Sequence, residues 1–171
     1  MASVPPVAVR PAREQDLDRL VDLLEAVAAE GRWLGTEAPV DRDHRRQRYA
    51  ETLDAERAAL LVAEADGEVI GQIGLDLAAY GVADLGMLVA AGWRGRGVGS
   101  ALVRAGLVWA RQAGAHKVAL QAWPHNQAAL ALYGRFGFQR EGYLRRHYRR
   151  RSGELWDAVV MGLELDRERV S

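Results

Sequence analysis

The chain has 171 residues, with 23 basic and 23 acidic side chains and no cysteine. This length is typical of one domain with a substantial hydrophobic core, so we expect a single domain over residues 1–171. A formal net charge of zero provides no general attraction for nucleic acid or an anionic membrane, and the lack of cysteine excludes disulfides, thiolate metal sites and a cysteine nucleophile. We find neither a long apolar run nor a signal-peptide pattern in residues 1–9, which predicts a cytoplasmic protein that does not enter a membrane.

Hydrophobic periodicity predicts alternating strands and helices in the first half of the chain. In chain order we expect a strand, two helices and two strands, at residues 7–10, 16–30, 43–56, 59–64 and 69–77. Between the two helices, residues 32–41 have no clear period, and such loops often carry binding residues. The dipeptide Asp66-Gly67 separates the two later strands and is typical of a tight antiparallel hairpin.

The second half of the chain continues this alternation and ends in a predicted hairpin. We expect a strand ending at Val89, a helix reaching Ala113, a strand at 117–123, a short helix at 127–135 and two long tail strands within 141–165. The strand at 117–123 should lie nearly parallel to the preceding strand, because a helix connects the two.

A glycine-rich stretch joins the strand that ends at Val89 to the following helix. Its sequence is Arg94-Gly95-Arg96-Gly97-Val98-Gly99-Ser100. A strand, a glycine-rich turn and a helix start together direct backbone N–H groups and the helix dipole toward an anion. Alternating glycines leave the backbone accessible, and Arg94 and Arg96 add charge. The stretch therefore predicts a diphosphate cradle, with a glycine-rich surface turn as the alternative interpretation.

The spacing within this stretch distinguishes between the known phosphate-binding motifs. A P-loop requires a lysine after its last glycine, and the only lysine in the chain is Lys117. A dinucleotide fingerprint would require Gly or Ala where Ser100 stands, and an acidic residue near positions 115–121. The pattern Arg/Gln-x-x-Gly-x-Gly/Ala is satisfied by Arg94, Gly97 and Gly99, and it resembles the acyl-CoA loop of the GNAT N-acetyltransferase superfamily.

A second motif strengthens this resemblance. The segment from Asn126 to Phe138, with Ala129, Leu132, Tyr133, Phe136 and Gly137 at fixed spacing, is similar to another GNAT signature. The resemblance implies a layered α/β (α+β) fold with a mixed, mostly antiparallel sheet of about seven strands and about four helices. That sheet would splay between its fourth and fifth strands, where CoA inserts. The implied reaction moves an acetyl group from acetyl-CoA to a primary amine by direct attack.

The resemblance also implies roles for individual residues. Tyr133 would protonate the leaving thiolate, Asn126 would cap a helix and contact the pantetheine arm, and a backbone N–H near Leu88 or Val89 would stabilise the oxyanion. Packing alone is the alternative for Tyr133. The expected contacts to acetyl-CoA are Met87, Leu88, Val89, Arg94, Gly95, Arg96, Gly97, Val98, Gly99, Ser100, Asn126 and Tyr133.

The catalytic base and the acceptor contacts are less well defined by the sequence. An amine of pKa ~10.4 is neutral in only about one molecule in 2,500 at pH 7, whereas an α-amine of pKa near ~8 needs little help. Asp84 is our candidate base, and a water chain to Glu37 or Asp76 is an alternative. Asp84 could also be an ordinary solvated carboxylate at the start of a strand, without a catalytic role. Trp33 and Glu37, in the loop at 32–41, are our candidate acceptor contacts.

Several broader alternatives remain open at this point. The acceptor is expected to be a small molecule or amino acid, with a protein N-terminus or lysine as competitors and a non-catalytic acyl-CoA sensor as a rival function. The basic cluster at 145–151 could bind RNA, but we expect a charged strand edge and no nucleic-acid partner. No two of the four histidines are spaced three or four residues apart, as metal ligands on a helix would be, so we expect no metal site. Strand edges in the tail would permit a homodimer.

Overall fold

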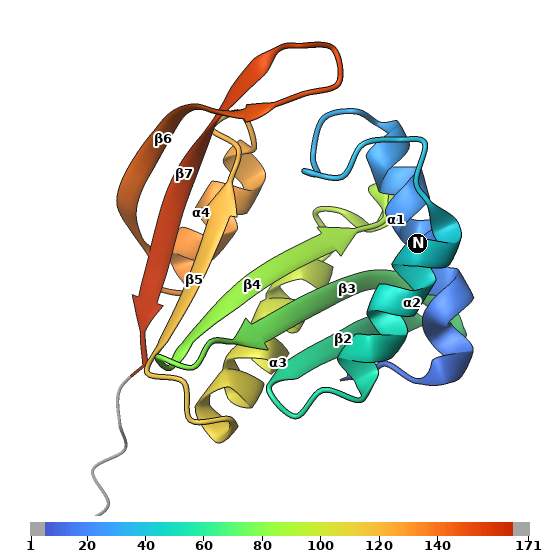
Figure 1. Ribbon diagram of the computed structural model, residues 1–171. Helices are drawn as coiled ribbons and strands as arrows, with labels where there is room; N and C mark the ends of the chain where they lie inside the picture. Colours follow the sequence, from blue (N-terminus) through green and yellow to red (C-terminus); the bar gives the residue numbers. More distant parts are fainter. Residues whose placement is uncertain (1–5, 166–171) are drawn as a thin grey trace, which may run out of the picture.

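One seven-stranded sheet runs through the molecule, in the strand order β1-β2-β3-β4-β5-β7-β6 (Figure 1). The computed structural model describes residues 6–165. The strands are β1 (Ala8–Pro11), β2 (Ala58–Ala65), β3 (Glu68–Leu77), β4 (Val82–Val89), β5 (Lys117–Ala122), β6 (Gln139–Arg149) and β7 (Leu155–Glu164). The α-helices are α1 (Leu17–Ala29), α2 (Arg42–Leu53), α3 (Val98–Gln112) and α4 (Gln127–Arg135). The mixed sheet with four helices confirms the predicted fold class.

Strands β1 to β4 form the first arm of the molecule, with helices on both faces. Helices α1 and α2 cover one face and α3 covers the other (Figure 1). Alternate residues of β3 supply the two faces, because successive strand side chains point in opposite directions. Ile73 packs in the core on the α3 side, whereas Gln72 donates a 2.6 Å hydrogen bond to the hydroxyl of Tyr49 on α2. The β2–β3 turn has left-handed φ values at both Asp66 and Gly67, as the predicted tight hairpin requires.

The splay between β4 and β5 is the feature that creates space for a ligand. The two strands are parallel, and their pairing is confined to Val82–Asp84 against Lys117–Ala119. Beyond that point β5 continues to pair with β7, and β4 continues to pair with β3. The edge of β4 that faces β5 therefore has no strand partner over Leu85–Val89. This arrangement confirms the predicted splay between the fourth and fifth strands.

The second arm consists of β5, β7, β6 and α4. The tail forms the predicted hairpin, but the second tail strand, β7, inserts between β5 and β6. Composition explains this order. Strand β7 buries Ala158, Val159 and Met161, whereas β6 carries several exposed arginines, and a charged strand is suited to an outer edge.

An ion-pair network fixes the start of the first arm. Arg10 on β1 donates hydrogen bonds to Asp16, just before α1, and to Glu64 on β2. Asp16 is only 2% exposed and also accepts a 2.8 Å hydrogen bond from the backbone N–H of Arg13. The network therefore joins β1, β2 and the beginning of α1. Within residues 6–165, no helix is both long enough and apolar enough to cross a membrane.

Candidate active site

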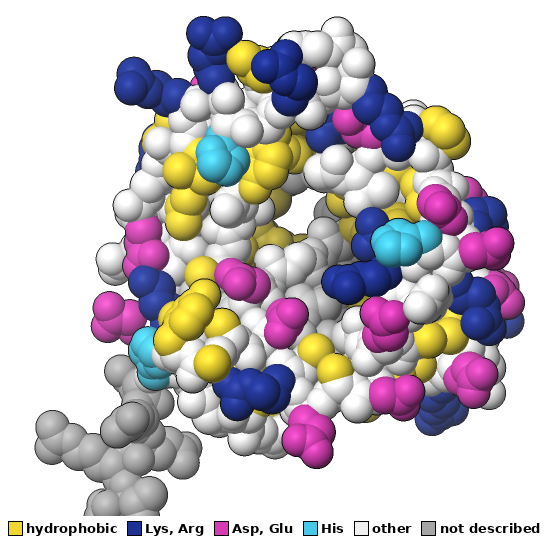
Figure 2. Space-filling model, in the orientation of Figure 1, with side chains coloured by type: hydrophobic (Ala, Val, Ile, Leu, Met, Phe, Trp, Pro, Cys, Tyr) yellow, Lys and Arg dark blue, Asp and Glu magenta, His cyan; other side chains and the backbone are white. Residues whose placement is uncertain are grey.

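A groove of about 590 Å³ lies between the two arms, where β4 and β5 separate. Figure 2 shows the molecule hollowed at its centre, with hydrophobic side chains around the hollow. The groove is lined by Leu85–Val89 of β4, the glycine-rich stretch, the end of β5 and one side of α4. Both motifs that resemble GNAT signatures therefore border the same space.

The glycine-rich stretch ends at the N-terminus of α3. Gly95 and Gly97 have φ values of 72° and 83°, in the left-handed region that favours glycine. Gly97 is the N-cap residue and contributes no side-chain cap, so the first N–H groups of α3 lack a side-chain partner there. These N–H groups and the helix dipole give the groove the positive character that a phosphate group requires.

Gly99 has a different role from Gly95 and Gly97. A Cβ atom at Gly99 would lie 2.9 Å from a methyl group of Leu132 and 3.5 Å from the terminal methyl of Met87. No atom lies within 4 Å of the corresponding position at Gly97. Gly99 therefore permits close packing of α3 against α4 and β4, whereas Gly97 is needed for its backbone conformation.

The arginines beside the cradle are already engaged within the protein. Arg94 donates two 2.8 Å hydrogen bonds to Glu30 at the end of α1 and a third, at 3.1 Å, to the carbonyl of Val89. The Arg94 guanidinium holds the pKa of Glu30 below its usual range. Arg96 is exposed, lies over the Trp93 ring and is outside the groove lining. Arg94 thus acts mainly as a connection between α1 and the end of β4.

These features fit an acyl-CoA molecule. Its pantetheine arm carries amide groups that could pair with the free edge of β4, and its diphosphate matches the uncapped start of α3. The apolar lining from β4 and α4 would accommodate the hydrocarbon parts. Residues 6–165 contain no cluster of three or more His, Asp or Glu side chains placed to hold a metal ion.

Helix α4 places Tyr133 in the groove. Asn126 caps this helix by accepting a hydrogen bond from the backbone N–H of Ala129, as the sequence predicts. The Tyr133 side chain lines the groove and its ring packs edge-on against Phe138, with 5.6 Å between ring centroids. Burial raises the pKa of Tyr133 to about 12, so its hydroxyl stays protonated at neutral pH.

Three aromatic side chains form one wall of the groove, which we call the aromatic wall: Trp33, Trp123 and Tyr148. Trp123 and Tyr148 pack edge-on at 5.2 Å, and the Tyr148 hydroxyl donates a 2.5 Å hydrogen bond to Gln121. The Trp123 indole N–H donates to the carbonyl of Trp33 at 3.0 Å. The wall therefore combines residues of both arms.

The loop at 32–41 crosses between the arms and is held by the β6–β7 turn. Arg150 donates to the carbonyls of Leu34 and Gly35, at 3.0 and 3.3 Å, and its Nε lies 3.5 Å from Glu37. Arg150 is only 6% exposed, and its guanidinium lies over the Trp156 ring, 4.1 Å from the centroid. A buried arginine from the second arm thus fixes a loop from the first arm.

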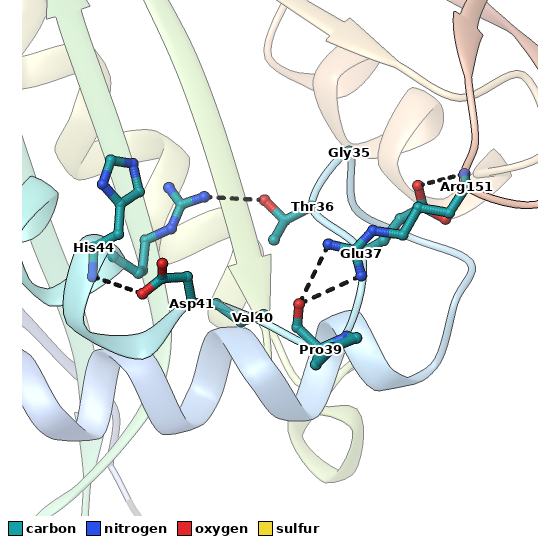
Figure 3. A pocket seen from close by; sticks show the side chains of 9 residues that line it. Gly35, Thr36, Glu37, Pro39, Val40, Asp41, His44 and Arg151 are labelled. Carbon is teal, nitrogen blue, oxygen red and sulfur yellow. Dashed lines mark hydrogen bonds between the residues drawn. The ribbon is translucent and has the colours of Figure 1, made fainter.

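A second, more polar pocket of about 340 Å³ lies on the other side of this loop (Figure 3). Glu37 accepts a 3.0 Å hydrogen bond from the backbone N–H of Arg151, and the Arg151 side chain donates to the carbonyls of Ala38 and Pro39. Figure 3 shows His44 across the pocket, on the side of α2. Glu37 therefore belongs to this pocket and to the loop contacts.

The groove brings together most, but not all, of the residues that the sequence singles out. Those in its lining are Trp33, Met87, Leu88, Val89, Arg94, Gly95, Gly97, Gly99, Ser100, Asn126 and Tyr133. Val98 is buried in the core beneath the cradle. Asp84 is exposed on β4 and lies outside the lining, as does Glu37. The roles of all these residues remain predictions.

Sequence reasoning missed the contribution of β5 and β6 to the groove. Gln121 and Trp123 line it from the end of β5, and Tyr148 lines it from the end of β6. A signal for Trp123 was available, because the carboxyl ends of two parallel strands lie at the same edge of a sheet. Tyr148 could not be found this way, since its position depends on the pairing of β6 with β7.

A mixed sheet splayed between β4 and β5, with an uncapped helix N-terminus beside the opening, defines an acetyltransferase-type fold that holds an acyl-CoA between its arms. The sequence profile of the acetyltransferase (GNAT) family matches residues 20–138. The chain belongs to this family, as its two motifs predict.

Individual proteins support the assignment. An L-amino acid N-acetyltransferase of Escherichia coli K12 is 35% identical over 109 residues, which cover 59% of this chain and 65% of that protein. The chain thus matches just under two thirds of this relative's length. The crystal structure of a ribosomal-protein-alanine N-acetyltransferase from Brucella melitensis has a TM-score of 0.84 and 25% identity, covering 92% of this chain and 99% of the other.

A third comparison concerns a structure with ligands. The spermidine N-acetyltransferase from Vibrio cholerae, in complex with CoA and spermine, has a TM-score of 0.81 at 20% identity and covers 92% of this chain and 95% of the other. This likeness shows the fold alone. The three proteins differ in their named acceptors, so the family does not by itself identify the acceptor of this chain.

Proposed function

We propose that the protein transfers the acetyl group of acetyl-CoA to the primary amine of a small molecule, most simply an amino acid, within one domain of residues 1–171. The observation that carries this proposal is the groove, in which the free edge of β4, the uncapped start of α3 and the Tyr133 hydroxyl border one space. A named function of the E. coli relative, acetylation of L-amino acids, agrees with it.

In the proposed reaction, acetyl-CoA supplies a thioester whose carbonyl carbon is electrophilic. The neutral amine nitrogen forms a C–N bond to that carbon, the C–S bond breaks, and the nitrogen loses one proton while the sulfur gains one. An acceptor that arrives as an ammonium ion first loses one further proton to water or a base. Backbone groups of β4 near Leu88 and Val89 would hold the donor and stabilise the negative charge that develops on the thioester oxygen. The start of α3 would hold the diphosphate.

The Tyr133 hydroxyl is the proposed proton donor to the leaving sulfur, and it would recover its proton from solvent. With a pKa of about 12, the phenol is a weak acid compared with a thiol of pKa ~8.5. Complete transfer to a free thiolate would be uphill by roughly 5 kcal/mol, so the proton should move only while the C–S bond is breaking.

The proton that the amine loses must be accepted by a group other than Tyr133. Asp84 stays our candidate base, but its exposed position outside the groove lining means that it would act through water. The α-amine of a peptide N-terminus, with a pKa of ~8, costs only about 1.4 kcal/mol to deprotonate at pH 7, and the α-amine of a free amino acid costs more because its carboxylate raises its pKa. We therefore expect Asp84→Asn to lower activity only toward acceptors of high pKa.

The test is the release of free thiol from acetyl-CoA, measured with amino acids, polyamines, aminoglycosides and N-terminal peptides. Release that depends on one class of acceptor would support the proposal. Tight binding of acetyl-CoA without release from any acceptor would favour a non-catalytic sensor instead. Absence of acetyl-CoA binding would contradict the proposed role of the groove.

Our other expectations follow from the same picture. We propose that the enzyme is cytoplasmic. We also propose that it has no nucleic-acid partner, because Arg150 and Arg151 of the basic cluster are used in contacts with the loop at 32–41. Salt-dependent RNA binding would contradict this. A homodimer would use the outer edge of β6, and sedimentation of the full chain would detect it.

A further inference from the structure

The aromatic wall is surrounded by arginine side chains. Arg32 lies 4.7 Å above the Trp33 ring, and Arg94 lies 5.7 Å from the same ring. On the other arm, Arg150 lies 5.7 Å from the Trp123 ring and 4.1 Å from the Trp156 ring behind it. Guanidinium groups therefore already occupy positions over the rings that could otherwise attract a cationic ligand.

The carboxylates close to these arginines already take part in hydrogen bonds and ion pairs within the protein. Both oxygens of Glu30 accept hydrogen bonds from Arg94, and one of them also accepts from the Trp33 indole N–H. Glu37 is bonded to the backbone of Arg151 and lies 3.5 Å from Arg150. The two carboxylates are outnumbered by four guanidinium groups, those of Arg32, Arg94, Arg150 and Arg151. The net charge of these groups is therefore positive.

The lining itself has the same character. Its charged side chains are Arg94 and Arg135, and Val27 and Leu34 add apolar surface to the aromatic wall in the lining. An acceptor with a second positive charge would be repelled, and one with a carboxylate would be attracted. An apolar side chain would be favoured by the indole and aliphatic surfaces.

We propose that the arginine-backed aromatic wall selects an α-amino acid with an apolar side chain and rejects polyamines and lysine, with Arg150 as the main determinant of this selection. The proposal rests on the acetyltransferase function given above. Arg150 is chosen because it lies behind the groove lining, against the Trp123 ring, and is the most buried of the four arginines. Glu37 at 3.5 Å balances part of its charge, and the remainder is screened least by solvent and salt.

Arg150 has two separable effects on the wall. Its charge acts on an acceptor at a distance, and its hydrogen bonds to Leu34 and Gly35 hold the loop in place. Arg150→Gln removes the charge and most of the bonds, whereas Arg150→Lys keeps the charge but loses the planar, multiply bonded group. A comparison of the two variants therefore separates electrostatic selection from simple positioning.

The experiment measures kcat/KM for L-phenylalanine, L-leucine, L-lysine and spermidine at saturating acetyl-CoA. For the unmodified protein we expect L-phenylalanine and L-leucine to exceed spermidine at least about 100-fold. In Arg150→Gln this ratio should fall about tenfold or more, and Arg150→Lys should restore most of it. Arg149→Gln, an exposed change next to Arg150 at the end of β6, should leave the ratio unchanged.

The outcomes distinguish this proposal from the function on which it rests. If no acceptor releases thiol, the acetyltransferase function itself fails. If thiol is released but spermidine equals the apolar amino acids, only the selection fails. If Arg150→Gln and Arg150→Lys raise KM for every acceptor by the same factor, with the ratio unchanged, Arg150 is a positioning residue only and our proposal is wrong.

Discussion

Tyr133 illustrates how burial changes the chemistry that a sequence motif predicts. A phenol of ordinary pKa near ~10 would be a modest acid toward a thiolate, but the groove raises the pKa of Tyr133 to about 12. The side chain then remains a hydrogen-bond donor at any physiological pH. Its ring also fills space against Phe138, so its packing and its proposed proton transfer can be separated by removing only the hydroxyl.

We expect Tyr133→Phe to lower kcat by about 100-fold, because general-acid catalysis by a positioned side chain is worth at least this much. Affinity for acetyl-CoA should change by less than about threefold, since the ring remains. Steady-state thiol release and equilibrium titration of acetyl-CoA measure the two quantities. Unchanged turnover, or a loss of affinity that accounts for the whole effect, would contradict the acid role.

A matched control for this experiment is Tyr143→Phe. Tyr143 lies on the exposed part of β6, and its hydroxyl donates a 2.6 Å hydrogen bond to Asp157 outside the groove. Loss of that hydroxyl should leave kcat unchanged. Since Tyr133 ionises only near pH 12, we also expect no limb of the pH–rate profile between pH 6 and 10 to disappear in Tyr133→Phe.

At the scale of elements, the glycine-rich stretch contains two kinds of glycine that look alike in the sequence. Gly97, the N-cap residue of α3, has a left-handed backbone and free space around its Cβ position. Gly99 lies within α3, where a Cβ would meet Leu132 of α4 at 2.9 Å. The alternation of glycines therefore serves both the cradle and the contact between α3 and α4.

We expect Gly97→Ala and Gly99→Ala to fail in different ways. Alanine at position 97 must adopt a left-handed φ, which costs about 1–2 kcal/mol, and relief of this strain would distort the cradle and weaken acetyl-CoA binding. Alanine at position 99 should displace the Leu132 side chain, which is next to Tyr133 on α4, so that kcat falls more than affinity. Isothermal titration and steady-state kinetics distinguish the two, and identical profiles would contradict this division.

Within residues 6–165 the sequence predicted every α-helix and strand, because these have clear ends, such as Asn126 before α4 and Gly97 before α3. It did not predict the two 3₁₀ helices, Glu14–Asp16 and Ala91–Trp93. It also predicted the splay, through the resemblance of two motifs. It did not predict that β7 would lie between β5 and β6, since strand order depends on pairing between distant segments. For the same reason it missed Trp123, Tyr148 and the loop contacts of Arg150, which join residues up to 116 positions apart.

At the scale of the whole molecule, the two arms differ in how they are stabilised. The first arm has a core on both faces of its sheet and the Arg10–Asp16–Glu64 network at its start. The second arm joins the first through the short β4–β5 ladder, and the loop at 32–41 adds a second connection. The groove lies between these two connections, so its shape depends on the first arm remaining folded.

The Arg10–Asp16 pair should therefore influence the stability of the whole protein in acid. The hydrogen bond from Arg10 is the main reason that the pKa of Asp16 lies below its ordinary value, and the N–H of Arg13 adds to it. A carboxylate with a lowered folded-state pKa stabilises the protein above its unfolded pKa of about 3.9, and this contribution is lost as the pH falls through the folded pKa.

We expect Asp16→Asn to lower the free energy of unfolding by about 2 kcal/mol at pH 7, and the difference from the unmodified protein to shrink below pH 4. Urea unfolding at several pH values measures this. Asp18→Asn is the matched control, because the Asp18 side chain is 75% exposed and its pair with Arg46 should contribute less than about 0.5 kcal/mol. Equal effects of the two substitutions, or a difference for Asp16→Asn that does not change with pH, would show that the buried pair does not set the acid stability of the first arm.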